Sequence, residues 1–259
     1  MNDDFILEGQ ALAKHFGGLR AVDGVTLRVR AGALHSIIGP NGAGKTTLFN
    51  LLSGTLKPTS GQVFFRGRDI THVPMHRMVH LGLGRSFQIT NIFPNLTVLE
   101  NVRLAVQALG RDNLTLWRDA RHFPQYVARA GEVIQQVALG GKEQVLARTL
   151  PHGDKRKLEL AILLAPDPAV LLLDEPTAGM ASEQVPHLME VINAIRMQGQ
   201  KTVLLVEHRM DVVMRASDRI TVMHQGQILA DGTPAAIAAN EVVQHAYLGG
   251  LYRDVEKPA

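Results

Sequence analysis

Leu34-His35-Ser36-Ile37-Ile38 leads directly into Gly39-Pro40-Asn41-Gly42-Ala43-Gly44-Lys45-Thr46-Thr47, and this stretch decides the fold. The first part has the composition of a buried strand, and the second matches the pattern G-x-x-x-x-G-K-T. The glycines let several backbone N–H groups point at one phosphate chain, and a following helix adds its positive N-terminal end. Lys45 would reach the β- and γ-phosphates, and the Thr46 hydroxyl would coordinate Mg²⁺. The stretch therefore predicts a nucleoside triphosphate site between a strand and a helix.

A second acidic motif follows another apolar run, Val170-Leu171-Leu172-Leu173-Asp174-Glu175. An all-apolar run of this length is typical of a strand in a sheet covered on both faces. Asp174 at its end can hold Mg²⁺ through water, and Glu175 can orient or deprotonate an attacking water. The alternative, an ordinary strand end before a turn, is weakened by the phosphate loop in the same chain.

Composition limits the remaining possibilities. The 259 residues suit one or two domains with a core of their own. The chain has no cysteine, which excludes disulfide scaffolds, thiol nucleophiles and cysteine-held metal sites. A net charge of +3 does not argue for nucleic acid. The N-terminus lacks a secretory pattern, and no apolar run approaches 18 residues, so we expect any membrane role to be peripheral.

The pattern along the chain is α/β with a helical insertion. We expect strands at 25–30, 34–38, 62–66, 170–173, 202–206, 220–223 and 227–230. We expect helices after the phosphate loop to residue 52, from 97 to about 109, at 125–138, from about 153, at 182–197 and at 210–216. Thr97 and Glu100 form a capping box. Residues 110–124, with Trp117, read as a surface loop, and the tail at 252–259 as a frayed end.

Two further motifs accompany these sites: the glutamine of Arg85-Ser86-Phe87-Gln88 and the histidine of Val206-Glu207-His208. In order and spacing, the four motifs resemble those of the ATP-binding subunit of ABC transporters, and the resemblance covers nearly the whole chain. It implies an ABC ATPase cassette of the P-loop NTPase fold, with an antiparallel β-subdomain, a helical subdomain, and ATP and Mg²⁺ as cofactors. As one domain over 1–259, the cassette would comprise a nucleotide-binding core at 1–91 and 166–235, a helical subdomain at 92–165, and a C-terminal helix and tail at 236–259.

Finer features resemble the branched-chain amino acid uptake branch. They are KHFGGL at 14–19, QITNIFPNLTVLENV at 88–102, DEPTAGM at 174–180, EHRMD at 207–211 and AYLGG at 246–250. The resemblance implies an ATP hydrolase that pairs with a second ABC ATPase subunit, as a homo- or heterodimer. The pair would lie on the cytoplasmic face of the inner membrane beneath two transmembrane permease subunits, served by an extracytoplasmic substrate-binding protein. Nucleic acid is not an implied partner.

The family assigns roles to matching positions. Phe16 resembles the aromatic residue that stacks on adenine, although a core phenylalanine is the alternative. Gln88 resembles the loop glutamine that contacts Mg²⁺ and transmits the nucleotide state, and its alternative is a solvated loop residue. His208 resembles the switch histidine at the γ-phosphate. The resemblance thus implies catalytic roles for Glu175, His208 and Gln88, and magnesium contacts from Thr46, Gln88 and Asp174.

The signature loop departs from the family pattern. The family commonly has Leu-Ser-Gly-Gly-Gln at a helix start that faces the partner's nucleotide, whereas this chain has Leu150-Pro151-His152-Gly153-Asp154. Pro151 supplies neither a hydroxyl nor an N–H, although proline at the first helical position would still allow the helix to form. A lost charge-assisted hydrogen bond is worth roughly 1.5–3 kcal/mol. We therefore expect a weaker composite site on this side of the dimer.

Other readings stay open at the level of sequence. The subunit could serve a urea or amide importer or a lipid exporter, because substrate choice lies in other subunits. A soluble ABC protein acting on ribosomes or DNA fits poorly, because the chain has one cassette and only a short insertion. A weakly catalytic, nucleotide-sensing regulatory subunit is favoured by Pro151 and opposed by the intact Asp174, Glu175 and His208.

Overall fold

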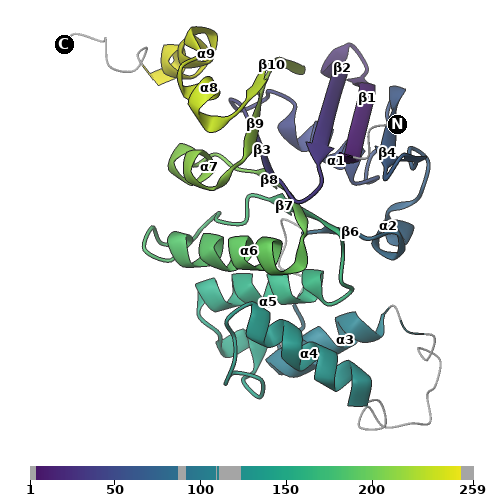
Figure 1. The fold of residues 1–259 in the computed structure, drawn as a ribbon, viewed down its shortest axis with the longest axis vertical. Helices are drawn as coiled ribbons and strands as arrows, with labels where there is room; N and C mark the ends of the chain where they lie inside the picture. The colour runs from purple at the N-terminus through teal and green to yellow at the C-terminus, as the bar shows by residue number, and fades with distance from the viewer. Residues whose placement is uncertain (1–3, 87–91, 109, 111–123, 252–259) are drawn as a thin grey trace. The chain divides into compact units, whose positions relative to one another are not determined.

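The computed structural model describes residues 4–86, 92–108, 110 and 124–251. Two compact units divide the chain, one formed by Met1–Met75 with Thr202–Ala259 and the other by His76–Lys201. Each unit is described by itself (Figure 1). Gln88, Trp117 and the tail at 252–259 lie outside the described residues. The predicted division into core and helical subdomain stays a prediction.

The first unit contains an antiparallel sheet in the order β2-β1-β4-β5. Its strands are β1 (Phe5–Phe16), β2 (Leu19–Arg30), β4 (Ser60–Phe65) and β5 (Arg68–Asp69). Along the second half of β2 the apolar residues Val25, Leu27 and Val29 are buried, and the residues between them are exposed. This alternation is typical of a half-buried strand, and it confirms the strand predicted at 25–30.

The same unit contains mostly parallel strands in the order β10-β9-β3-β8. They are β3 (Leu34–Ile38), β8 (Thr202–Val206), β9 (Arg219–His224) and β10 (Gln227–Gly232), and β3 pairs in parallel with both β8 and β9. Every residue of β3 and β8 is buried, which explains why most of their residues are apolar. The polar side chains of His35 and Ser36 in β3 are hydrogen-bonded to Thr221 and Ser217. Helix α1 (Lys45–Leu52) follows β3.

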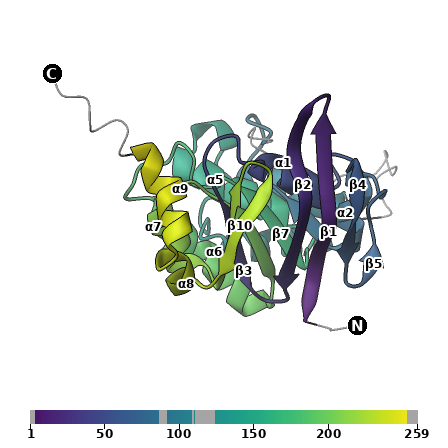
Figure 2. The same ribbon diagram turned by 90° about the horizontal axis from the view of Figure 1, so that it is seen from above.

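Three C-terminal helices pack beside β9 (Figure 2). They are α7 (Met210–Ala216), α8 (Pro234–Ala238) and α9 (Glu241–Leu251). A buried cluster joins the helices to β3 and β9 through Val213, Ile237 and Val243 on the helices and Ile38 and Val222 on the strands. Burial of these apolar side chains holds the three helices against β3 and β9.

The second unit combines a short parallel pair of strands with a helical layer (Figure 1). The strands are β6 (Leu83–Arg85) and β7 (Val170–Asp174). The helices are α2 (Met75–Leu81), α3 (Val98–Gln107), α4 (Pro124–Gln136), the 3₁₀ turn η2 (Ala147–Thr149), α5 (His152–Leu164) and α6 (Val185–Gly199). Helices α3, α4 and α5 contact one another through buried aliphatic side chains.

The N-termini of the helices agree only in part with the capping rules applied to the sequence. The Thr97 hydroxyl accepts a hydrogen bond from the Glu100 backbone N–H at 3.2 Å, as predicted for the cap of α3. The Glu100 carboxylate instead pairs with Arg103 at 2.8 Å, so only half of the capping box forms. Helix α6 begins at Val185, later than the predicted 182, with proline in its first turn.

Several elements were not expected from the sequence. Strand β1, helix α2 and strand β6 had no specific prediction, and β2 extends back to Leu19. Within the described ranges, no helix is long and apolar enough to cross a membrane.

Candidate functional site

The phosphate loop is a close-packed turn between β3 and α1. Gly44, the N-cap of α1, has a φ of 97°, and a Cβ there would lie 2.3 Å from the Ala21 carbonyl oxygen. At Gly39 an added Cβ would lie 2.3 Å from the Met223 carbonyl oxygen. Gly42, at φ 79°, faces open space. The loop therefore requires glycine for close approach at two positions and for its left-handed backbone conformation at Gly42 and Gly44.

Lys45 opens α1 and is buried, with a relative exposure of 5%. Its ammonium donates to the carbonyl oxygens of Gly39 at 2.7 Å and Pro40 at 2.9 Å. The first amides of a helix have no acceptor within that helix, and its N-terminus carries partial positive charge. A buried ammonium, helix amides and a glycine turn together form a cradle whose chemistry fits a phosphate chain. Thr46, beside Lys45, is exposed.

The sheet of the first unit brings His208 to the same edge as this loop. Strands β3 and β8 run in parallel with Ile37 opposite Val206, so the residues that follow each strand leave at the same carboxyl edge. His208 is exposed, and its backbone N–H donates to the carboxylate of the buried Glu207 at 3.2 Å. The sequence pattern Val206-Glu207-His208 did not predict this hydrogen bond from the His208 N–H to Glu207.

Phe16 ends β1 beside the turn at Gly17. Its side chain is 48% exposed, and the Lys14 ammonium lies 5.3 Å from the ring centroid. The alternative of a core phenylalanine is therefore wrong. An exposed ring with a cation on one face can accept a second planar group, and its stacking on adenine stays a prediction.

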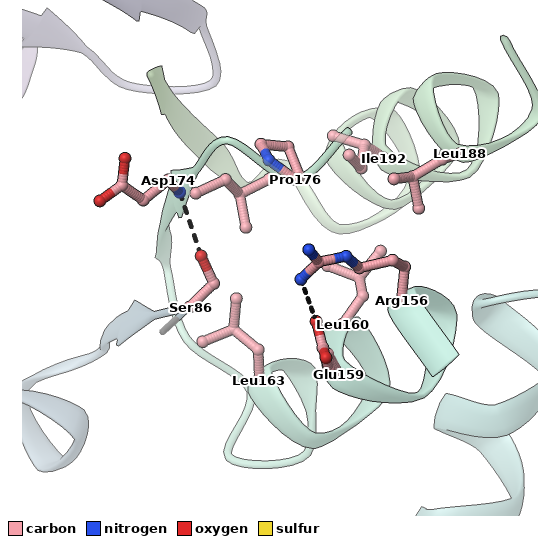
Figure 3. Close-up of a pocket in the computed structure, with 10 residues that line it drawn as sticks. Ser86, Arg156, Glu159, Leu160, Leu163, Asp174, Pro176, Leu188 and Ile192 are labelled. Atoms are coloured by element: carbon pink, nitrogen blue, oxygen red, sulfur yellow. Dashed lines mark hydrogen bonds and ion pairs between the residues drawn. The ribbon is translucent and has the colours of Figure 1, made fainter. Parts of the chain in front are cut away.

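The acidic strand end lies in the second unit. Asp174 ends β7 and is 5% exposed, and its backbone N–H donates to the Ser86 hydroxyl at 3.1 Å (Figure 3). Burial lowers the pKa of Arg85, and the nearby Asp174 carboxylate partly opposes that change. The parallel pairing of β6 with β7 thus places Arg85, Ser86 and Asp174 at one edge. Gln88, which follows them, lies outside the described residues.

Glu175 has an unusual backbone conformation. Its φ is 48°, in the left-handed region, which costs a residue with a Cβ about 1–2 kcal/mol. Its carbonyl oxygen accepts a hydrogen bond from the Ala178 N–H at 3.0 Å, which closes a tight turn after the strand. Strained backbone of this kind persists where the surrounding structure holds it, and such places cluster at functional sites.

Comparison with known proteins decides the family. Residues 22–178 match the model of the ABC transporter family.

The chain belongs to the ABC transporter family.

Residues 227–252 of this ABC protein also match the model of the branched-chain amino acid ATP-binding cassette transporter. The high-affinity branched-chain amino acid transport ATP-binding protein BraF of Pseudomonas aeruginosa is 39% identical over 252 residues, covering 94% of this chain and 98% of that protein. A nucleotide-free ATP-binding cassette from an ABC transporter superimposes with a TM-score of 0.83, at 30% identity, over 94% and 98% of the two chains. A dimeric cassette in a post-hydrolysis state, bound to ADP and phosphate, has a TM-score of 0.73 at 25% identity, covering 88% of this chain and 99% of that one. The P-loop NTPase fold is thus confirmed.

The signature loop of this ABC cassette differs from the expectation in one detail. Pro151 is the N-cap of α5 and not its first helical residue, with φ −56° and ψ 157°. Its carbonyl still accepts the first helical bond, from the Lys155 N–H at 3.0 Å, because a cap residue needs no N–H of its own for that bond. Leu150 is buried, and Asp154 pairs with Lys142.

The residues predicted to contact magnesium offer oxygen donors. The Thr46 hydroxyl stands in the first turn of α1, and the Asp174 carboxylate is buried at a strand end. Oxygen ligands in small number suit Mg²⁺, which keeps waters and substrate phosphates as its remaining ligands. A buried carboxylate is also stabilised by a cation. The donor chemistry fits, and the assignment stays a prediction.

Proposed function

We propose that this chain is the ATP-binding and ATP-hydrolysing subunit of an ABC importer for branched-chain or other hydrophobic amino acids. The observation that carries the proposal is the phosphate loop, with its buried Lys45 and close-packed glycines, in a chain that matches BraF over nearly the full length of both proteins. The same likeness supports a location at the cytoplasmic face of the membrane, on permease subunits.

The phosphate chain of ATP is held by the loop residues. Lys45 exchanges its two carbonyl acceptors for phosphate oxygens, and the amides of Gly42 to Thr47 surround the β-phosphate. Thr46, Asp174 and Gln88 would hold Mg²⁺, which when bound neutralises charge on the phosphates. Phe16 stacks on the adenine ring.

Glu175 supplies the base. Its carboxylate takes a proton from the attacking water, while His208 fixes the γ-phosphate. The turn closed by the Ala178 N–H and the Glu175 carbonyl includes this residue in its left-handed conformation, which sets the direction in which the side chain leaves the backbone.

A second ABC ATPase subunit completes the site. The dimeric post-hydrolysis relative supports a pair of cassettes. In that pair each chain would present its signature loop to the other's nucleotide, as the family resemblance implies. Two permease subunits would respond to closure of that pair, and an extracytoplasmic binding protein would deliver the amino acid.

The decisive test replaces Glu175 with glutamine. Glu175→Gln should bind ATP with normal affinity, whereas phosphate release by the assembled transporter should fall on the order of 10²–10⁴-fold because a general base is lost. Near-normal hydrolysis would refute the assignment. Uptake of radiolabelled leucine, compared with urea, by the assembled transporter separates the amino acid importer from the amide importer.

A regulatory reading has one observation in its favour, the proline cap of α5. It predicts nucleotide binding with little phosphate release, whether or not the partner subunits are present. Hydrolysis measured with and without a purified partner ATPase separates the two functions.

A further inference from the structure

A partly buried ion pair on α5 joins Arg156 and Glu159 (Figure 3). The Arg156 guanidinium donates to the Glu159 carboxylate at 2.8 Å, and these side chains are only 16% and 18% exposed. A second Arg156 nitrogen donates to the Ala178 carbonyl oxygen at 3.2 Å. The Arg156 side chain therefore joins α5, the helix that begins at the signature loop, to the loop that follows Asp174 and Glu175.

Apolar side chains surround this pair on its inner side. A cavity of about 30 Å³ beside it is walled by Leu160 and Leu163 of α5 and by Leu188 and Ile192 of α6. Hydrogen bonds and ion pairs are stronger where water is excluded, and a guanidinium there is held to the acceptors that face it. Glu159 thus fixes the direction from which Arg156 reaches the loop.

The loop contacted by Arg156 is tied at Ala178 both to the turn and to the helix. The Ala178 N–H donates to the Glu175 carbonyl, while the Ala178 carbonyl accepts from Arg156, so one residue joins the turn to the helix through two successive peptide groups. Gly179, at φ 73°, passes close to α5, since a Cβ there would lie 3.6 Å from the His152 ring. Glu175, with its φ of 48°, is the first residue of the turn that the hydrogen bond from the Ala178 N–H closes.

We infer that Arg156 is a positioning residue for hydrolysis: by holding the Ala178 carbonyl, it fixes the turn that directs the Glu175 carboxylate toward the attacking water. The inference rests on the proposed function, in which Glu175 is the base. Arg156 contacts neither nucleotide nor water in this role. Its loss therefore changes the hydrolytic step and leaves ATP binding at the phosphate loop intact.

The test measures phosphate release by the assembled transporter with Arg156 variants. Arg156→Met loses both bonds, and we expect kcat to fall roughly tenfold, with the KM for ATP within about twofold of wild type. Arg156→Lys keeps the charge beside Glu159 but cannot serve both acceptors as a guanidinium does, so we expect a loss of about threefold. Wild-type kcat in either folded variant overturns the inference.

The matched control is Arg129→Met. Arg129 also pairs with a glutamate three residues on, Glu132 at 3.1 Å, and with Asp167 at 3.3 Å, on a helix that carries no site residue. This variant should show wild-type kcat. If it loses as much activity as Arg156→Met, the effect is a general one on the helical unit and the inference is wrong. Arg156→Lys, which keeps the partly buried charge pair, decides the question if Arg156→Met does not fold.

A double variant separates this inference from the proposed function. In a Glu175→Gln background, Arg156→Met should reduce the residual turnover by less than about twofold, because the group it positions is already absent. A full tenfold further loss would assign Arg156 a role independent of Glu175 and overturn the inference. Normal hydrolysis by Glu175→Gln alone would instead refute the base assignment, which is a separate outcome.

Discussion

The two helix starts that are proposed to face phosphate, those of α1 and α5, differ in their residues and in their backbone conformation. Helix α1 begins after Gly44 in the left-handed conformation and has a lysine and no acidic residue in its first turn. Helix α5 begins after Pro151 in an extended conformation and has Asp154 in its first turn, paired with Lys142. In the proposed function, the first binds phosphate with groups of its own loop. The second offers helix amides and a compensated carboxylate, and we propose that it contributes to a site that other groups must complete.

Glycine substitutions should show this difference most strongly. Gly44→Ala should lower the free energy of unfolding by about 3–4 kcal/mol, because its φ is positive and its Cβ would overlap the Ala21 carbonyl. Gly42→Ala, which meets nothing, should cost only about 1 kcal/mol. Gly153→Ala in α5 should change stability by less than about 1 kcal/mol, since its Cβ would meet only side-chain ends, that of Gln184 at 3.0 Å and that of Met180 at 3.8 Å. Chemical denaturation measures all three, and equal losses would remove the distinction between the two loops.

Protonation of His35 at low pH should destabilise the unit that contains the phosphate loop. This histidine of β3 is fully buried, bonds to Thr221 at 2.7 Å, and has its pKa lowered to about 4 by burial, which Asp231 opposes and Arg219 reinforces. The unfolded chain, with a histidine pKa near 6.5, binds the proton more readily. Stability should therefore be full above pH 6.5 and fall by roughly 3 kcal/mol as the pH drops to 4.

Unfolding measured against pH checks this prediction. His35→Gln should flatten the fall between pH 6.5 and 4, whereas His224→Gln, at a half-buried position on β9, should leave it unchanged. A pH profile of His35→Gln that matches wild type would contradict the prediction.

Lysines in the first turns of the two helices should differ in nucleotide binding. Lys45→Met should weaken ATP binding by the isolated chain about 100-fold, or roughly 2.7 kcal/mol, through lost charge-assisted hydrogen bonds. Lys155→Met, in the first turn of α5, should leave the dissociation constant within about twofold. Titration with a fluorescent ATP analogue measures both, and similar losses would mean that α5 binds nucleotide in the chain's own site.

The smallest expected effect is at the proline cap. Pro151→Ser restores a hydroxyl and a cap acceptor at the start of α5, so turnover by the assembled pair should rise roughly tenfold, about 1.4 kcal/mol. ATP affinity of the isolated chain should not change. Unchanged turnover together with unchanged nucleotide affinity in the pair would exclude a weakened composite site.

The sequence predicted the strands whose pattern of apolar residues is regular. Strands β3, β7 and β8 are mostly apolar runs that end at recognisable motifs, and the structure places them as expected. Strand β1 had no such signal, because Ala11 at φ 47° and the register shift between Gly9 and Leu12 interrupt its alternation. Strand β6 has only three residues, too few for a period to show.

The residues of the candidate site also fall into two groups, those that the sequence could predict and those that it could not. Lys45, Asp174 and His208 could be named because each follows a buried strand within a dense motif. The Ser86 hydroxyl and the Arg156 bridge could not, since both act through backbone groups far away in the sequence. The i,i+3 spacing of Arg156 and Glu159 was visible, but such pairs are usually surface features, and only burial distinguishes this one.

The two hydrogen bonds of the Lys45 ammonium to its own loop have a consequence for selectivity. The loop carries an internal competitor, so an incoming anion must replace two carbonyl contacts before it gains the lysine. A single anion gains too few contacts to offset the loss of these two hydrogen bonds, whereas a chain of linked phosphates makes several contacts with the loop at once. We therefore expect this loop to favour polyphosphates over isolated anions.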